Sequence, residues 1–126
     1  CALFCYFGPA PRAFIEAESV AQIVNAATGW EPSLDDLLET GERAVNLARL
    51  FNMREGFTPQ DDRLPGRLFA PSEAGELAGQ AIDRLEFERA VAHLYTLKDW
   101  SRATGMPSPE RLKRLGLEWT ATVMNS

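Results

Sequence analysis

The chain has 126 residues, 45% of them hydrophobic and 25% charged, which suits one ordinary globular domain and excludes a disordered chain. Its net charge of −5 argues against a nucleic-acid partner, which would need a basic face. No apolar run approaches the roughly 20 residues of a membrane-spanning helix, so we expect a cytoplasmic protein without a membrane partner.

The first seven residues, Cys-Ala-Leu-Phe-Cys-Tyr-Phe, resemble buried core rather than a natural chain start. This favours a chain cut from a longer protein, and a lipid-modified Cys1 is the alternative. Cys1, Cys5 and the single histidine, His93, are too few for a structural zinc site or an iron–sulfur cluster, each of which needs four ligands. By spacing alone the cysteines are two buried thiols, or one thiolate completes a site whose other ligands lie elsewhere.

The first predicted helix is marked at both ends. Ser19 is followed three residues later by Gln22, a capping-box pattern that predicts a helix from Ser19 to about Ala27. Gly29 can adopt the left-handed conformation that ends a helix, so we expect the chain to turn there.

A second and longest helix is predicted from Ser33 to about Asn52, because Ser33 and Asp36 repeat the start signal. Gly41 lies in mid-helix, which suggests that another backbone packs close to it. The apolar residues recur at spacings of three and four and predict a central, largely buried helix. They are Leu34, Leu37, Leu38, Ala44, Val45, Ala48 and Phe51.

Residues 52–82 show no helical or strand period, and we expect a long ordered loop there. Asp83 and Glu86 then predict the start of a third helix that runs to about Trp100. Its apolar stripe is Phe87, Ala90, Val91, Leu94 and Leu97.

A last short helix is predicted from Ser108 as cap and Pro109 at its first turn, ending at Gly116. Because no strand pattern appears, the predicted fold class is all-α. We expect one irregular multi-helix domain over residues 1–126, with the long loop between its second and third main helices.

Four charged residues around this loop form a candidate polar site. Two carboxylates, Asp61 and Asp62, lie between Arg54 and Arg67. Guanidinium groups bind carboxylates through paired hydrogen bonds, so these charges could lock the loop. They could equally contact a cofactor in the rest of a larger enzyme.

Several separate motifs together resemble the C-terminal domain of the aldehyde:ferredoxin oxidoreductase family. They occur in order over roughly residues 1–119, which makes the resemblance specific. They are Asn25-Ala26-Ala27-Thr28-Gly29-Trp30, Gly41-Glu42-Arg43, Asn46-Leu47-Ala48-Arg49-Leu50-Phe51-Asn52, Arg54-Glu55-Gly56-Phe57, Asp61-Asp62-x-Leu64-Pro65-x-Arg67, then Tyr95, Trp100, Gly105 and Pro107, and Leu112-x-x-Leu115-Gly116-Leu117.

The resemblance implies a parent enzyme that oxidises aldehydes to carboxylic acids with a tungsten or molybdenum bis-pterin and a four-iron four-sulfur cluster. Its electrons would pass to ferredoxin or another carrier. Cys1 stands where the family's last cluster cysteine would be, although the Asp-x-x-Gly-Leu portion before it is absent here. We therefore expect Cys1 to be a cluster ligand in the parent enzyme, and the chain alone to be inactive and to bind none of these cofactors.

We expect this chain to pack against the cofactor-bearing remainder of its own polypeptide. The candidates for contact with a cofactor are Arg54, Asp61, Asp62 and Arg67. Some relatives instead reduce an aromatic thioester, so the resemblance leaves the substrate open. The alternative is a free-standing helical interaction module without metal.

Overall fold

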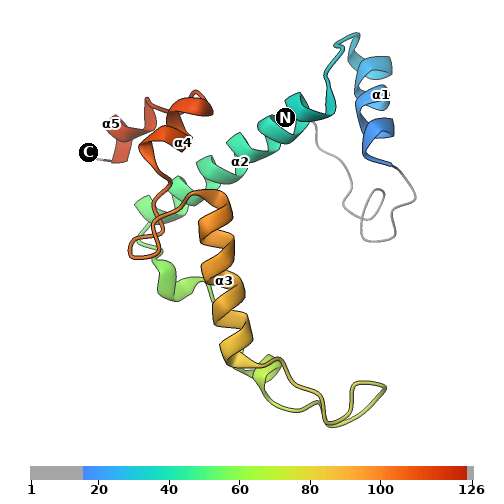
Figure 1. Cartoon of the computed structure of the whole chain (residues 1–126), viewed down its shortest axis with the longest axis vertical. Helices are drawn as coiled ribbons and strands as arrows, with labels where there is room; N and C mark the ends of the chain where they lie inside the picture. Colours follow the sequence, from blue (N-terminus) through green and yellow to red (C-terminus); the bar gives the residue numbers. More distant parts are fainter. Residues whose placement is uncertain (1–15, 125–126) are drawn as a thin grey trace. The chain divides into compact units, whose positions relative to one another are not determined.

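The computed structural model describes residues 16–124, and over that range five α-helices and two short 3-10 helices occur without any strand (Figure 1). The predicted all-α class is confirmed. The chain divides into two compact units, Cys1–Ala48 and Arg49–Ser126, which are described separately. One domain over residues 1–126 stays a prediction. Among the described residues, no helix combines the length and apolar character needed to cross a bilayer.

In the first unit, α1 (Ala17–Thr28) begins two residues before the predicted cap. Glu16 is its N-cap residue and makes no side-chain capping hydrogen bond, so the prediction that Ser19 caps the helix is wrong. The end is as predicted: Gly29 has φ of 69° and its N–H donates to the carbonyl of Asn25 at 2.8 Å.

The start of α2 (Leu34–Arg54) confirms the second capping prediction. The backbone N–H of Ser33 donates to the Asp36 carboxylate at 2.8 Å, and the N–H of Asp36 donates to Ser33 Oγ at 3.1 Å. These two reciprocal hydrogen bonds satisfy two of the backbone donors at the helix start. With 21 residues, α2 is the longest helix of the described chain.

The predicted burial of the α2 stripe is wrong for the described residues. Leu38 and Val45 are 58% and 44% exposed. No atom of the described chain lies within 4 Å of a Cβ built at Gly41, so the close backbone inferred from this glycine is also absent there. The periodicity identified the helix correctly, but not its surroundings.

In the second unit, both predicted caps of the later helices are confirmed. The Asp83 side chain accepts from the Glu86 N–H at the start of α3 (Arg84–Lys98). Ser108 accepts from the Arg111 N–H at the start of α4 (Pro109–Arg114). The short α5 (Thr120–Met124) follows and was not predicted.

The core of the second unit lies at the C-terminal ends of its helices rather than along the predicted α3 stripe. Leu94 and Leu97 are 45% and 63% exposed, whereas Tyr95 is buried. The predicted stripe is therefore wrong as a core face. The other buried hydrophobic side chains of this unit are Leu50, Leu112, Leu115 and Leu117.

The long loop contains η1 (Pro59–Asp61) and η2 (Gly66–Phe69). Beyond them an isolated bridge pairs Ser72 with Ala78. Figure 1 shows this last part as an arm that projects past the N-terminal end of α3. The loop is thus ordered locally, as predicted.

Candidate functional site

A single arginine of α2 connects four segments of the second unit. Arg49 is only 7% exposed. Its Nη1 donates to Asp62 Oδ2 at 2.7 Å and its Nη2 to the Tyr95 hydroxyl at 2.8 Å. Its Nε donates to the carbonyl of Gly105 at 3.1 Å. Because the guanidinium is a rigid planar fork, these contacts fix the loop after η1, the end of α3 and the loop before α4 around one group.

Tyr95 completes this cluster by donating its hydroxyl hydrogen to Asp62 Oδ2 through a very short hydrogen bond. Burial raises the pKa of the Tyr95 hydroxyl above its ordinary value, and the hydrogen bond to Asp62 adds to the effect. Tyr95 therefore stays a neutral donor over a wide pH range. Asp62 Oδ2 accepts from two donors, Arg49 Nη1 and the Tyr95 hydroxyl.

Trp100 forms the aromatic wall of the cluster. The guanidinium carbon of Arg49 lies 4.9 Å from the centre of the Trp100 ring, and Tyr95 meets that ring edge-on with centres 5.6 Å apart. Such cation–π contacts gain strength when the cation is shielded from water. The turn that follows is closed by the N–H of Gly105, which donates to Ser101 at 2.7 Å.

A shallow hollow of about 390 Å³ lies beside the cluster. Asp62, Tyr95 and Trp100 line one part of it. Apolar side chains of α3 and the loop, together with the charged loop residues Asp61 and Arg63, line the rest; the apolar ones are Leu64, Phe87, Val91 and Leu94. Three of the five residues of the predicted α3 stripe, Phe87, Val91 and Leu94, therefore line this hollow instead of a packed core.

Arg54 and Asp61 do not join the cluster. Arg54 pairs with its neighbour Glu55 at 2.9 Å and lies over the ring of Phe51. Asp61 accepts from the backbone N–H and hydroxyl of Thr58, and these hydrogen bonds lower the pKa of its carboxyl group. Both residues serve local structure within a few positions of themselves.

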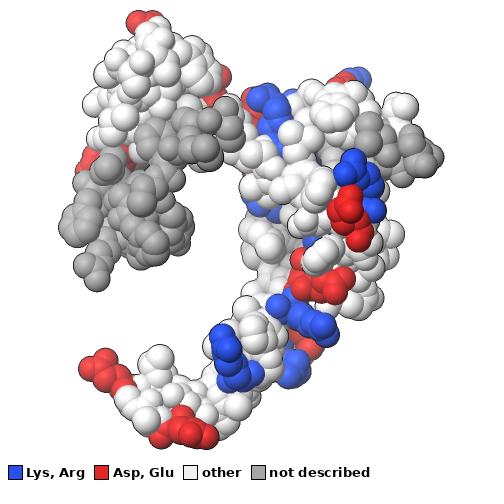
Figure 2. All heavy atoms as spheres, turned by 180° about the vertical axis from the view of Figure 1, so that it is seen from behind, with Lys and Arg blue, Asp and Glu red and all other residues white. Residues whose placement is uncertain are grey.

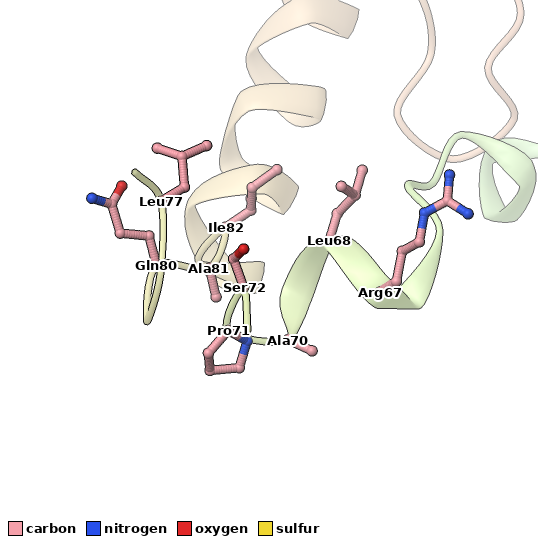
Figure 3. A pocket seen from close by; sticks show the side chains of 9 residues that line it. All are labelled: Arg67, Leu68, Ala70, Pro71, Ser72, Leu77, Gln80, Ala81 and Ile82. Atoms are coloured by element: carbon pink, nitrogen blue, oxygen red, sulfur yellow. The ribbon is translucent and has the colours of Figure 1, made fainter. Parts of the chain in front are cut away.

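Arg67 lies in η2 and lines a second hollow of about 480 Å³ at the base of the arm. Figure 3 shows its guanidinium extending away from the apolar side chains of Leu68 and Ile82. The Arg67 side chain is exposed and makes no hydrogen bond or ion pair with any residue in 16–124. The prediction that Arg54 and Arg67 hold the loop by binding its carboxylates is therefore wrong. The arginine that binds Asp62 is Arg49.

The four predicted cofactor-binding residues are thus not gathered in one site. Arg54 and Asp61 bind neighbouring residues, Asp62 belongs to the Arg49 cluster, and Arg67 has no partner among residues 16–124. Arg49 and Tyr95 were not predicted as site residues. A signal for them existed, since they lie with Asp62, Trp100 and Gly105 in the segments that carry the family resemblance. Nothing in those segments shows that the five residues meet.

Cys1, the predicted cluster ligand, lies outside the described residues. Within residues 16–124, no group of three or more histidine, cysteine, aspartate and glutamate side chains could hold a metal ion. His93 is exposed on α3. Figure 2 shows acidic side chains on the projecting arm and basic ones where it joins the body of the second unit.

Comparison with known proteins connects these residues to one enzyme family. The family model described as aldehyde ferredoxin oxidoreductase, domains 2 & 3, matches residues 1–117. The tungsten-containing aldehyde ferredoxin oxidoreductase of Pyrococcus horikoshii is 38% identical over 104 residues, 81% of this chain and 16% of that protein. The proteins of the same name from Pyrococcus abyssi and Pyrococcus furiosus are 36% and 33% identical over 92% and 91% of this chain. The chain spans 16–18% of the length of these three relatives.

Proposed function

Because the chain belongs to the aldehyde ferredoxin oxidoreductase family, we propose that it is the C-terminal helical part of an enzyme that oxidises aldehydes to carboxylic acids. This reaction adds one oxygen atom from water to the carbonyl carbon and releases two electrons and two protons. The observation that carries the proposal is the family match over residues 1–117.

The redox chemistry would come from cofactors held mainly by the rest of such an enzyme. When bound, a tungsten or molybdenum bis-pterin and a four-iron four-sulfur cluster would supply it, with ferredoxin or another carrier as electron acceptor. The names of the relatives, which contain both tungsten and ferredoxin, support this part of the proposal. Because one thiolate cannot hold such a cluster, we expect no cofactor on this chain alone.

Within the proposal, this chain contributes the Cys1 thiolate as one cluster ligand. A cluster of this kind takes four thiolates, so three would come from other parts of the enzyme. Cys5 has no assigned role and stays a core thiol in this proposal. Both assignments rest on the sequence.

Arg67 is the residue that best fits a polar contact to a cofactor or to the rest of the enzyme. Its guanidinium is exposed and has no partner within residues 16–124, so an anionic group can approach it without breaking an existing contact. Arg54, Asp61 and Asp62 fit less well, because each already has a partner in the chain.

The two cysteines allow a matched test in the full-length gene product, purified without oxygen. We expect Cys1→Ser to lose most of the cluster iron and the electron paramagnetic resonance signal of the reduced cluster. Cys5→Ser should keep both. Retention of the full signal in Cys1→Ser would contradict the ligand assignment and leave the family membership intact.

The coding region upstream of Cys1 tests the larger proposal separately. Several hundred codons that end in Asp-x-x-Gly-Leu directly before Cys1 would support it. A start codon close to Cys1, together with a product free of iron and tungsten, would favour the metal-free interaction module instead.

A further inference from the structure

The middle of the chain has little to hold it in place. All residues from 51 to 94 are described, and none of them is buried. Segments with few buried apolar contacts open at a lower free energy than the core of the same protein. This stretch is therefore the weakest part of the second unit, although most of it has a defined local structure.

Asp62 connects the first half of the loop to the helices. Within the described residues, every hydrogen bond or ion pair from residues 58–65 to α2 or α3 uses its carboxylate, which binds Arg49 and Tyr95. The other hydrogen bonds of residues 58–65 lie within that stretch, such as those between Thr58 and Asp61, or join it to η2, where the N–H of Leu68 donates to the carbonyl of Pro65. Loss of this one carboxylate would leave those residues without a polar link to the helices.

The second half of the loop is held at the start of α3. Phe69 meets Phe87 edge-on with ring centres 5.7 Å apart, and the Arg84 guanidinium lies 4.2 Å from the centre of the Phe69 ring. The N–H of Ile82 donates to the carbonyl of Leu68 at 3.0 Å, so η2 and the end of the arm are joined to each other. This pairing allows the arm to move together with η2.

We propose that residues 58–82 form a lid that opens, and loses its internal hydrogen bonds, as one cooperative unit while the helices stay folded, and that the Asp62 carboxylate is its latch on Arg49 and Tyr95. Gly56, with φ of 93°, precedes the lid, and the capping residue Asp83 follows it. The hollow of about 390 Å³ is lined by lid residues on one side and by α3 on the other. Opening the lid therefore removes one wall of this hollow and uncovers Phe87, Val91 and Leu94. The lid is a property of this chain and does not depend on the proposed reaction.

Amide hydrogen exchange on the full 126-residue chain tests the lid. The test variant is Asp62→Asn, and Asp61→Asn at the neighbouring position is its control. Asp61 bonds only within the loop, whereas Asp62 reaches Arg49 and Tyr95. Reporters within the lid are the N–H groups of Leu68, Gly79 and Ile82; the Leu117 N–H, bonded to Leu112 at 2.8 Å, reports on the core. Losing a charge-assisted contact should speed exchange in the lid roughly tenfold or more in Asp62→Asn. Asp61→Asn should leave these lid amides near their wild-type rates, and Leu117 should stay protected in both.

Three results would overturn the proposal. They are equal lid exchange in the two variants, faster exchange confined to residues 58–65, and equal acceleration of the lid and Leu117. Tyr95→Phe gives a second measurement if Asp62→Asn does not fold. It removes one of the two latch hydrogen bonds and keeps the ion pair, so a smaller acceleration of the same three lid amides is expected. No acceleration in Tyr95→Phe would count against the latch.

Discussion

The backbone of Gly105 lies directly against the guanidinium of Arg49. A Cβ atom built at Gly105 would lie 1.9 Å from Nη2 of Arg49 and 3.0 Å from its Cζ. The carbonyl of the same glycine accepts a hydrogen bond from Nε of Arg49, 56 positions earlier in the chain. The missing side chain is therefore what allows the guanidinium to lie between Gly105, Tyr95 and Asp62.

Gly105→Ala should destabilise the second unit more than an alanine at an open glycine with similar backbone geometry. Gly75 is the matched control, because its φ of 83° resembles the 74° of Gly105 but a Cβ there meets nothing within 4 Å of the described chain. The left-handed backbone alone costs about 1–2 kcal/mol for a residue with a side chain. Gly105→Ala also displaces a buried arginine bound at three sites. Urea unfolding should show at least about 1 kcal/mol more loss for it than for Gly75→Ala. If both variants lose the same free energy of unfolding, the Arg49 side chain can move aside without loss of stability, and the prediction is wrong.

The sequence predicted helix starts well where the signal is contained in a few neighbouring residues. Ser33 with Asp36, Asp83 with Glu86 and Ser108 with Arg111 are all three positions apart. Their geometry depends on the backbone of one turn only. Ser19 carried the same pattern and failed, because α1 extends two residues further and places it inside the first turn.

The Arg49 cluster could not be predicted in this way, because its partners are 13, 46 and 56 positions away. The sequence reading paired Asp61 and Asp62 with Arg54 and Arg67, the arginines nearest to them beyond Arg63. Only the folded chain shows that Arg54 is bound to Glu55 instead. Periodicity likewise detected α3, but not that Tyr95, beside the stripe, is its buried residue. The role of Cys1 stays a prediction.

The contrast between Ser33 and Ser19 gives a test of capping. Ser33→Ala removes an acceptor for the Asp36 N–H and a hydroxyl that donates to the Asp36 carboxylate. A lost cap of this kind costs about 1 kcal/mol. Ser19→Ala removes no capping bond, so its effect on the free energy of unfolding should stay within about 0.5 kcal/mol. Thermal unfolding followed by circular dichroism compares the two variants. A loss of unfolding free energy in Ser19→Ala as large as that in Ser33→Ala would contradict the assigned start of α1.

The raised pKa of Tyr95 predicts a loss of stability in alkali. In the unfolded chain Tyr95 gives up its proton near pH 10, whereas the folded chain retains it to higher pH because burial disfavours the phenolate. Its contribution to the free energy of unfolding is therefore complete below about pH 10 and falls as the pH rises through the raised folded pKa.

Tyr95→Phe cannot titrate at this position, so the difference in unfolding free energy between wild type and variant should shrink above about pH 10. Urea unfolding of both proteins between pH 8 and pH 11 measures this difference. The wild-type chain contains two tyrosines, and the phenolate absorbance of one of them should appear at a higher pH than that of the other. This high-pH step should be absent in the variant. Parallel stability curves over the whole range would contradict the prediction.

Leu115, at the end of α4, is the core residue whose truncation should lower the free energy of unfolding most, because its side chain is only 1% exposed. Leu115→Ala should lower the free energy of unfolding by about 2–5 kcal/mol, because it removes buried methyl groups and leaves a cavity. Leu97→Ala is the matched control, since Leu97 is 63% exposed in the described chain and should change stability by less than about 1 kcal/mol. Urea unfolding of the full chain compares them. A loss at Leu97 as large as that at Leu115 would mean that the apolar face of α3 is covered when the chain is free in solution.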